Sequence, residues 1–240
     1  VTSHSLWRWG QGEVGDGMWA MVYYFIGSRE PPERRSVRED VEKRPRRRMK
    51  GEERYRQLLQ VATHEFAQHG YGKVGTSDIA RRASVAEPTI YRHFESKYDL
   101  FVTTARQAAE EVLGGLRQAA EGAPSAAAAL KSVARSFLED LEQRPELLFM
   151  FRRAVEESDD PDIRDLASKH LREAHSLLVQ LLQQARREGA VTSEADAEAL
   201  AWALVGLGEL AITAQMLNMW DAAMRQRLQE AWRALTGLAG

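Results

Sequence analysis

Hydrophobic positions are spaced differently in the first fifty residues and in the rest of the chain. Residues 1–27 are rich in Trp and Gly with no helical period, and residues 28–50 are dense in charge and contain proline. From residue 55 onward, apolar side chains recur at intervals of three and four, which is typical of one face of an α-helix. No alternating strand pattern follows. The pattern therefore predicts an all-α protein with about nine helices.

The first two predicted helices lie close together between residues 55 and 83. The apolar stripe of the first helix consists of Tyr55, Leu58, Leu59, Ala62 and Phe66. Gly70 follows this helix and suits a left-handed C-terminal cap. Thr76 or Ser77 is expected to cap the second helix, because a hydroxyl oxygen can accept a hydrogen bond from a free backbone N–H. The inward residues of that helix are Ile79, Ala80 and Ala83.

A tight turn and a third short helix complete a helix-turn-helix pattern. Ser84 and Val85 form the predicted turn, and the third helix covers about residues 87–93. Its inward positions are Ile90 and, just beyond it, Phe94, which leaves polar side chains on the outward face. Ser96 then starts a longer helix, because Asp99 follows three residues later as in a capping box.

The remaining chain divides into six predicted helices. Pro and Gly residues separate them, and Ser193 is the expected cap of the fifth. The predicted helices cover residues 96–120, 125–143, 145–157, 161–188, 194–220 and 221–238.

The ordered residues of the helix-turn-helix region resemble the TetR family of transcriptional regulators. The matching positions are Phe66, Ala67, Gln68, His69, Gly70, Tyr71, Thr76, Ile79, Ala80, Ala83, Pro88, Thr89, Ile90, Tyr91, Arg92, His93, Phe94, Ser96 and Lys97. Two positions depart from the family pattern: Ser84 stands where glycine is usual, and Ala86 where Ser or Thr is usual. A glutamate at position 87 also replaces the basic or small residue that is common there.

The resemblance implies a helix-turn-helix head joined to a helical bundle that binds a small molecule and dimerises. We expect a disordered or loosely attached basic extension at residues 1–48, the DNA-binding head at 49–97 and the ligand-binding body at 98–240. The last two long helices are expected to pair with those of a second subunit. The implied partners are a near-palindromic double-stranded operator and a small-molecule effector, without a cofactor and without a membrane.

Charge is distributed unevenly along the chain. Residues 1–97 hold 18 Lys or Arg against 13 Asp or Glu, whereas residues 98–240 hold 15 against 22. The basic end suits an anionic partner. The absence of cysteine excludes disulfides and thiolate-bound zinc and agrees with a cytoplasmic location.

The N-terminal region leaves two alternatives open. Its apolar run at residues 18–27 is too short to span a membrane and poorly suited to a signal peptide. The residues before about position 40 form an expected upstream extension, with Val41 or Met49 as the natural start. The basic run Lys43–Lys50 is either a solvated tail or, as we favour, an arm that lies along DNA.

Contacts with DNA are assigned to the arm and to the outward face of the head. Thr89 and Arg92 are expected to reach base edges, while Tyr91, His93 and Lys97 act on phosphates. The full predicted set is Arg46, Arg47, Arg48, Thr76, Ser77, Pro88, Thr89, Tyr91, Arg92, His93 and Lys97.

The helix at residues 194–220 is apolar on nearly all sides from Ala199 to Met219, so it must be covered on all sides. A membrane span is disfavoured because Glu209 and Gln215 lie near its middle. Burial against a second subunit is favoured. The predicted dimer contacts are Trp202, Leu207, Leu210, Ala211, Leu217 and Trp220.

The effector is expected to be apolar or amphipathic, although aromatic and Met side chains form packed cores more often than pocket walls. The available aromatic, Met and His residues are Phe101, Phe137, Phe149, Met150, Phe151, His170, His175, Trp202 and Met216. The predicted ligand contacts are Phe101, Phe137, Phe149, Met150, Arg153, His175 and Trp202. Arg152 and Arg153 have two interpretations, a contact with an anionic ligand and surface exposure, of which surface exposure is favoured. His170 and His175 lie five residues apart, which makes a poor metal pair.

The predicted function is therefore ligand-responsive regulation of transcription. The resemblance implies a repressor that its effector releases from operator DNA, which is the usual form in the family. No phosphate loop, nucleophile elbow or HExxH motif indicates an enzyme. The alternative is a helical dimeric interaction module whose head no longer binds DNA. Retention of Arg81, Arg82, Arg92 and Lys97 favours a working head.

Overall fold

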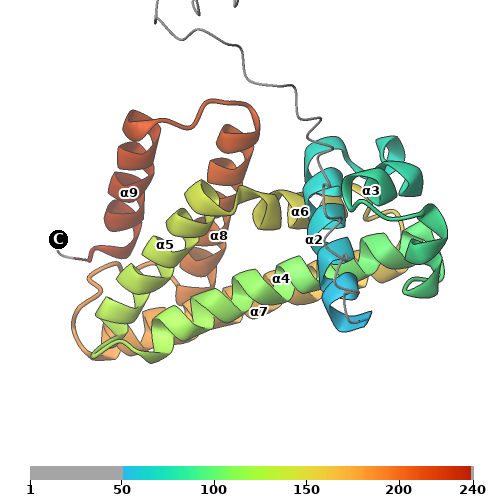
Figure 1. The fold of residues 1–240 in the computed structure, drawn as a ribbon. Coiled ribbons are helices and arrows are strands. Elements are labelled where there is room, and N and C mark those ends of the chain that lie inside the picture. Colours follow the sequence, from blue (N-terminus) through green and yellow to red (C-terminus); the bar gives the residue numbers. More distant parts are fainter. Residues whose placement is uncertain (1–50, 239–240) are drawn as a thin grey trace, which may run out of the picture. The chain divides into compact units, whose positions relative to one another are not determined.

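The predicted all-α fold is confirmed in the computed structural model, which describes residues 51–238 (Figure 1). All nine predicted segments are helical, and the described residues contain no strand. The elements are α2 (Gly51–His69), η1 (Tyr71–Lys73), α3 (Thr76–Arg82), η2 (Glu87–Arg92), α4 (Lys97–Glu121), α5 (Ala126–Gln143), α6 (Pro145–Glu156), α7 (Pro161–Arg187), α8 (Ala197–Met216) and α9 (Ala222–Thr236).

Two short 3-10 helices distinguish the head from the predicted pattern. The third predicted helix, η2, is a 3-10 helix, and η1 is a single turn that was not predicted. Pro88 lies in the first turn of η2, where a missing N–H costs nothing. The expected inward residues Ile79, Ala83 and Ile90 are all fully buried. The helical period was therefore sufficient to identify the buried face even where the helix type differed.

Capping residues were predicted correctly for α4 and incorrectly for α3 and α8. The Ser96 hydroxyl accepts a hydrogen bond from the Asp99 backbone N–H at 3.0 Å, as expected. Helix α3 instead begins after Gly75, whose N–H donates to the Asp78 carboxylate at 3.2 Å. Asp196, not Ser193, caps α8.

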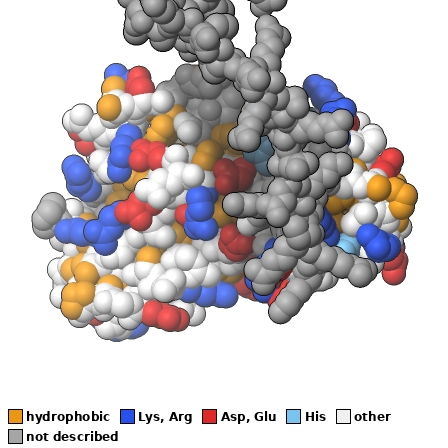
Figure 2. Space-filling model, viewed as in Figure 1, with side chains coloured by type: hydrophobic (Ala, Val, Ile, Leu, Met, Phe, Trp, Pro, Cys, Tyr) orange, Lys and Arg blue, Asp and Glu red, His pale blue; other side chains and the backbone are white. Residues whose placement is uncertain are grey.

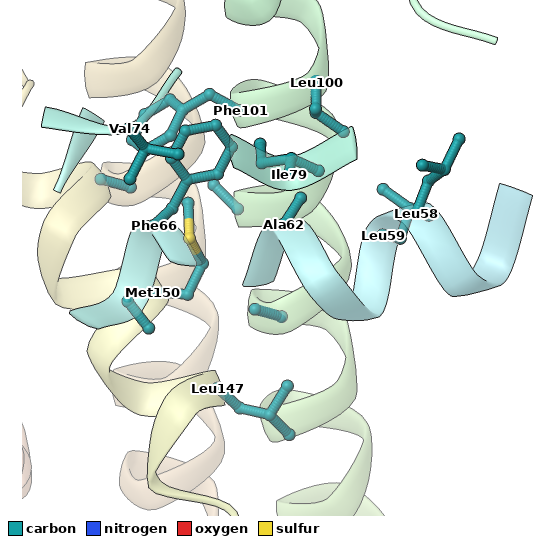
Figure 3. Packing of buried hydrophobic residues seen from close by; sticks show 14 of the residues in the cluster. Leu58, Leu59, Ala62, Phe66, Val74, Ile79, Leu100, Phe101, Leu147 and Met150 are labelled. Atoms are coloured by element: carbon teal, nitrogen blue, oxygen red, sulfur yellow. The ribbon is translucent and has the colours of Figure 1, made fainter. Parts of the chain in front are cut away.

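The helices of the head and the body share one hydrophobic core. Phe66 of α2 and Phe101 of α4 meet edge to face, with ring centroids 5.1 Å apart. Met150 of α6 lies beside Phe66 in the same cluster, and Leu147 extends it along α4 (Figure 3). Helix α6 therefore packs on α2 as well as on α4, which connects the body directly to the head.

The body is built around the long helices α4 and α7. Helix α4 packs against α5, α6 and α7, while α8 packs against α7 and α9 (Figure 1). Helices α8 and α9 lie at the end of the body remote from α3. A second apolar cluster joins α5, α7, α8 and α9. This arrangement leaves room between the helices of the body for the cavity described below.

Candidate DNA interface and ligand cavity

Helix α2 contacts α3 through polar side chains as well as through the hydrophobic core. The carboxylate of Glu65, whose side chain is 4% exposed, pairs with the Arg82 Nε at 3.0 Å. The Gln57 amide donates to the Ala83 carbonyl oxygen at 3.2 Å, where α3 ends. A buried carboxylate needs such a partner, so this pair fixes α3 against α2.

The turn after α3 requires a left-handed backbone at Ser84. Its φ is 54°, and the Val85 N–H closes the turn by donating to the Ala80 carbonyl oxygen at 2.9 Å. The Ser84 side chain is exposed. A residue with a Cβ is strained in this region, whereas glycine is not.

Replacing Ser84 with glycine is therefore expected to stabilise the protein by about 1 kcal/mol, because it relieves the left-handed strain. Chemical denaturation should show the gain as a higher midpoint with an unchanged slope. Ser77→Gly is the matched control, since Ser77 is exposed within α3 and glycine should lower stability there. Equal stability of Ser84→Gly and the original protein would contradict the assigned strain.

The outward face of η2 presents a group of polar side chains to solvent. Tyr91 is 51% exposed, and Pro88 and Arg92 are also exposed. Thr89 is half-buried and accepts a hydrogen bond from the Arg92 guanidinium at 3.2 Å. Thr89 and Arg92 therefore lie side by side on one surface of the head.

Thr76 is part of an internal contact between α3 and η2. Its side chain is buried, and its hydroxyl donates to the Glu87 carboxylate and lies 3.1 Å from the Tyr91 hydroxyl. Ser77, the next residue, is exposed. Of the two hydroxyl residues predicted to contact DNA, Thr76 holds the two helices together and Ser77 is the one open to solvent.

The other predicted DNA contacts lie on the flanks of the head. The Lys97 ammonium lies 4.2 Å above the ring of Tyr71, and His93 is half-buried beside Tyr55. The basic arm residues Arg46, Arg47 and Arg48 lie outside the described residues.

A hydrogen bond at the start of α4 joins the head side of the molecule to α7. The Tyr98 hydroxyl donates to the Asp160 carboxylate at 2.8 Å. This hydrogen bond raises the pKa of Tyr98 to about 12 and lowers the pKa of Asp160 below its ordinary value. At neutral pH Tyr98 is therefore protonated and Asp160 is ionised, as this hydrogen bond requires.

A cavity of about 480 Å³ lies within the helical body. Its wall is mainly apolar and is contributed by α4, α5, α6, α7, α8 and α9. The larger apolar wall residues include Leu116, Phe137, Leu138, Leu148, Phe151, Leu178, Leu204, Ile212, Leu228 and Trp232. The volume and the wall are those of a small-molecule site.

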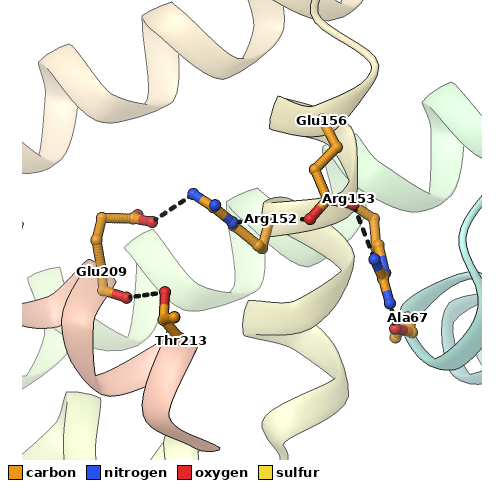
Figure 4. Close-up of polar contacts among 6 residues, drawn as sticks. All are labelled: Ala67, Arg152, Arg153, Glu156, Glu209 and Thr213. Carbon is orange, nitrogen blue, oxygen red and sulfur yellow. Dashed lines mark hydrogen bonds and ion pairs between the residues drawn. The ribbon is translucent and has the colours of Figure 1, made fainter. Parts of the chain in front are cut away.

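His170 and Glu209 are among the titratable groups that interrupt the apolar wall. Burial lowers the pKa of His170 to about 4, so its imidazole is neutral at pH 7, and its ring packs on Phe151 with centroids 4.7 Å apart. Burial raises the pKa of Glu209, whose carboxylate lies 3.6 Å from the Arg152 guanidinium (Figure 4). Basic side chains also line the cavity, on α5 and α9.

Of the predicted ligand contacts, Phe137 lines the cavity, whereas the other six do not. Phe101 and Met150 are fully buried in the core shared with α2, and Phe149 packs against that core, because α6 crosses the head. Arg153 donates to the Ala67 carbonyl oxygen of α2 at 3.3 Å. In this segment Phe149, Met150 and Arg153 therefore contact the head, whereas Phe151 lines the cavity.

His175 and Trp202 form a separate contact at the surface. Their rings stack with centroids 4.2 Å apart, and the His175 imidazole lies 3.1 Å from the Glu198 carbonyl oxygen. Trp202 is 49% exposed, so it faces away from the cavity. The cavity residues absent from the predicted set include Phe151, His170 and Glu209. Glu209 had a signal in the sequence, since it interrupts an otherwise apolar helix.

One face of α8 exposes large apolar side chains. Leu210 is 46% exposed and Leu217 is 62% exposed, and both lie on the same side of the helix as Trp202. Met219, just beyond the helix, is 59% exposed. Figure 2 shows charged side chains of both signs interspersed with hydrophobic side chains over the described part of the face viewed there. An apolar face of this kind calls for a covering partner.

The other residues predicted for this face lie elsewhere. Ala211 is buried and Leu207 lines the cavity, while the Trp220 indole donates to the Glu142 carboxylate at 3.3 Å. Among the described residues, α8 is the one helix whose length and composition would allow it to cross a membrane, and a third of that stretch is buried. Such a helix is weak evidence for a membrane, because core helices of soluble proteins have the same properties. Between residues 51 and 238 no cluster of three or more His, Asp or Glu is arranged to hold a metal ion.

Two family models match the sequence. Residues 58–104 match the model described as bacterial regulatory proteins, tetR family, and residues 149–235 match the tetracyclin repressor-like C-terminal domain. Together the two matches cover more than half of the chain. They correspond to the head with the start of α4 and to the body from α6 to α9.

Individual proteins resemble different lengths of the chain. A TetR-family transcriptional regulator from Streptomyces coelicolor has a solved structure with a TM-score of 0.67 and 25% identity, covering 78% of this chain and 95% of that one. The transcriptional activator FasR of Mycolicibacterium smegmatis is 32% identical over 95 residues, which are 40% of this chain and 43% of FasR. The probable acrEF/envCD operon repressor of Escherichia coli K12 is 47% identical over 45 residues, which are 19% of this chain and 20% of that repressor. The chain thus matches less than half the length of each of these two relatives.

Proposed function

This chain belongs to the TetR family of bacterial regulatory proteins, and we propose that it is a ligand-responsive transcriptional regulator that binds operator DNA as a homodimer. The observation that carries the proposal is the position of α6. This helix contributes Leu148 and Phe151 to the cavity and packs Met150 against the core of the head. A molecule that fills the cavity therefore contacts the helix on which α2 rests.

The proposed direction of regulation is repression that the effector relieves. Two heads can bind successive major grooves only when their recognition elements are about one turn of DNA, roughly 34 Å, apart. A ligand that tilts α4 or α6 so that this distance is lost weakens DNA binding, and thermodynamic linkage then requires that DNA weaken ligand binding by the same factor. FasR is named an activator and the acrEF/envCD relative a probable repressor, so both directions occur among similar proteins.

The proposed dimer covers the exposed face of α8. Trp202, Leu210 and Leu217 supply large apolar contacts on that face, and the His175 ring holds Trp202 in place. A twofold arrangement of α8 and α9 with those of a second subunit would bury this face in a four-helix bundle. We place the protein in the cytoplasm, where operator DNA is found.

The proposed effector is an apolar or amphipathic small molecule. The cavity supports this class because its wall is mainly apolar and because His170 is neutral there. A thermal-shift screen of lipophilic compounds, followed by assays of operator release, tests the proposal, since a ligand that binds the native state raises the melting temperature. Stabilisation and operator release by metal ions or sugars alone would contradict it.

Filling the cavity is expected to abolish the response to the effector without abolishing DNA binding. Ala134 lines the cavity from α5, so Ala134→Trp places a large ring in the ligand's space. Affinity for a compound found in the screen should fall by at least about tenfold, because its apolar contacts are lost. Ala195→Trp, in the exposed segment before α8, is the matched control. Release that is undiminished in Ala134→Trp would place the effector site elsewhere.

A further inference from the structure

The carboxylate of Glu209 is an unusual feature of the cavity wall. Among the described residues that line the cavity, Glu209 is the one acidic residue. Its side chain is 33% exposed, and its charged neighbour is Arg152, whose nearest nitrogen lies 3.6 Å away. This separation is too long for a good hydrogen bond, so within residues 51–238 the carboxylate has an ionic neighbour but no hydrogen-bond donor within normal distance.

A carboxylate in an apolar wall is stabilised by a nearby hydrogen-bond donor or positive charge. Burial raises the pKa of Glu209, and the Arg152 charge opposes that rise only in part. Leaving such a group without a donor costs free energy, which a ligand recovers when it supplies an N–H. The site is therefore better matched to a donor group than to another acceptor.

We propose, on the basis of the function proposed above, that Glu209 determines effector specificity by binding a protonated amine at the polar end of an otherwise apolar molecule. The ammonium group replaces Arg152 as the close partner of the carboxylate and forms the short, charge-assisted hydrogen bonds that Arg152 does not form. The apolar part of the molecule then lies against Phe137 and Phe151.

The other charged groups of the cavity do not oppose this assignment. Arg225 is paired with Glu142 at 2.9 Å. Lys131, Arg135 and Arg233 are exposed on α5 and α9, where water screens their charges. His170 is neutral at pH 7 and therefore does not repel a cation.

A movement of Arg152 can be transmitted to the head through neighbouring side chains of α6 (Figure 4). Arg152 and Arg153 share Glu156, at 3.9 Å and 2.8 Å respectively. Arg153 also donates to the Ala67 carbonyl oxygen near the end of α2. When an ammonium group binds Glu209, the Arg152 guanidinium moves closer to Glu156. This weakens the ion pair between Arg153 and Glu156 and alters the hydrogen bond from Arg153 to α2.

Three probes of equal chain length test the specificity: decylamine, 1-decanol and decanoate. Calorimetry on the full chain should show decylamine binding at least about tenfold more tightly than 1-decanol, and decanoate more weakly than both. In Glu209→Gln the advantage of decylamine should disappear while 1-decanol binds as before. Glu139→Gln, an exposed carboxylate of α5, is the matched control and should retain the advantage.

The outcomes separate this inference from the function on which it rests. Binding of 1-decanol without any preference for decylamine, or tightest binding of decanoate, overturns the role of Glu209 and leaves the apolar cavity intact. Failure of all three probes to bind overturns both the inference and the proposed apolar effector. A decylamine preference that survives in Glu209→Gln assigns the cation to another group and also overturns the inference.

Hydrogen exchange tests the route to the head. Decylamine should change exchange at residues 66–71, where the Gly70 N–H donates to the Phe66 carbonyl oxygen at 2.8 Å. In Arg153→Gln this ligand-induced change should vanish although decylamine binds with unchanged affinity. Arg106→Gln, an exposed residue of α4, is the control. A change in Arg153→Gln equal to that in the original protein would contradict the route.

Discussion

Leu210→Glu is expected to convert the proposed dimer into monomers. Leu210 lies in the middle of the exposed apolar face of α8, between Trp202 and Leu217. In a twofold dimer one substitution places two carboxylates in the same apolar contact, where neither has a charged partner. The dissociation constant should rise by at least about a hundredfold, which sedimentation velocity at micromolar concentration would detect.

A matched variant separates loss of the dimer from a general effect of added charge. Gln118→Glu introduces the same carboxylate at an exposed position of α4 and should leave the dimer intact. Helix content should be unchanged in both variants, because Leu210 is a surface residue of the single chain. If Leu210→Glu sediments as the original protein does, α8 is not the interface. A monomeric original protein would remove the basis for two-headed recognition.

Two substitutions in the head are expected to weaken DNA binding in different ways. Arg92 is exposed on η2 beside Thr89, so Arg92→Ala should cost about 1–3 kcal/mol and relax base preference at one position of each half-site. Lys97 begins α4 at the edge of the head. Lys97→Ala should weaken binding to all sequences and flatten the salt dependence by about one unit of slope.

Fluorescence anisotropy over a series of salt concentrations distinguishes the two roles, when it is combined with a set of single-base variants of the duplex. Arg106→Ala provides a control, since Arg106 is an exposed basic residue of α4 outside the helix-turn-helix unit. Uniform weakening by both Arg92→Ala and Lys97→Ala would show that Arg92 does not read bases. An unchanged salt slope in Lys97→Ala would contradict its assignment to phosphate.

Local patterns in the sequence were sufficient to predict the helices. The spacing of Leu58, Ala62 and Phe66 defined a buried stripe, and Ser96 with Asp99 defined a cap, because both signals depend on neighbours within a few residues. The cap of α3 was assigned wrongly because the Thr76 hydroxyl donates a hydrogen bond to the Glu87 carboxylate, across the turn. This contact depends on how η2 packs and has no local signal.

The cavity could be predicted only in part because its wall comes from six helices. Phe137 faces the cavity, whereas Met150 and Phe101 face the head, although all three are large apolar residues at helical spacing. Which of these two environments a residue occupies depends on how α6 packs across α2. These helices are far apart in the sequence, so no local pattern indicates that packing. Glu209 was visible as a polar interruption in α8, but its position in the wall required the packing of α8 on α6.

The most direct test of the central claim is selection of duplexes from a random DNA pool by the purified 240-residue chain, with and without a lipophilic compound that raises its melting temperature. The account predicts enrichment of a near-palindromic site bound by one dimer, and loss of that complex when the compound is added. Failure to enrich any sequence would contradict it and would favour a helical interaction module with an inactive head. Enrichment of a site that the compound does not release would contradict the ligand response alone.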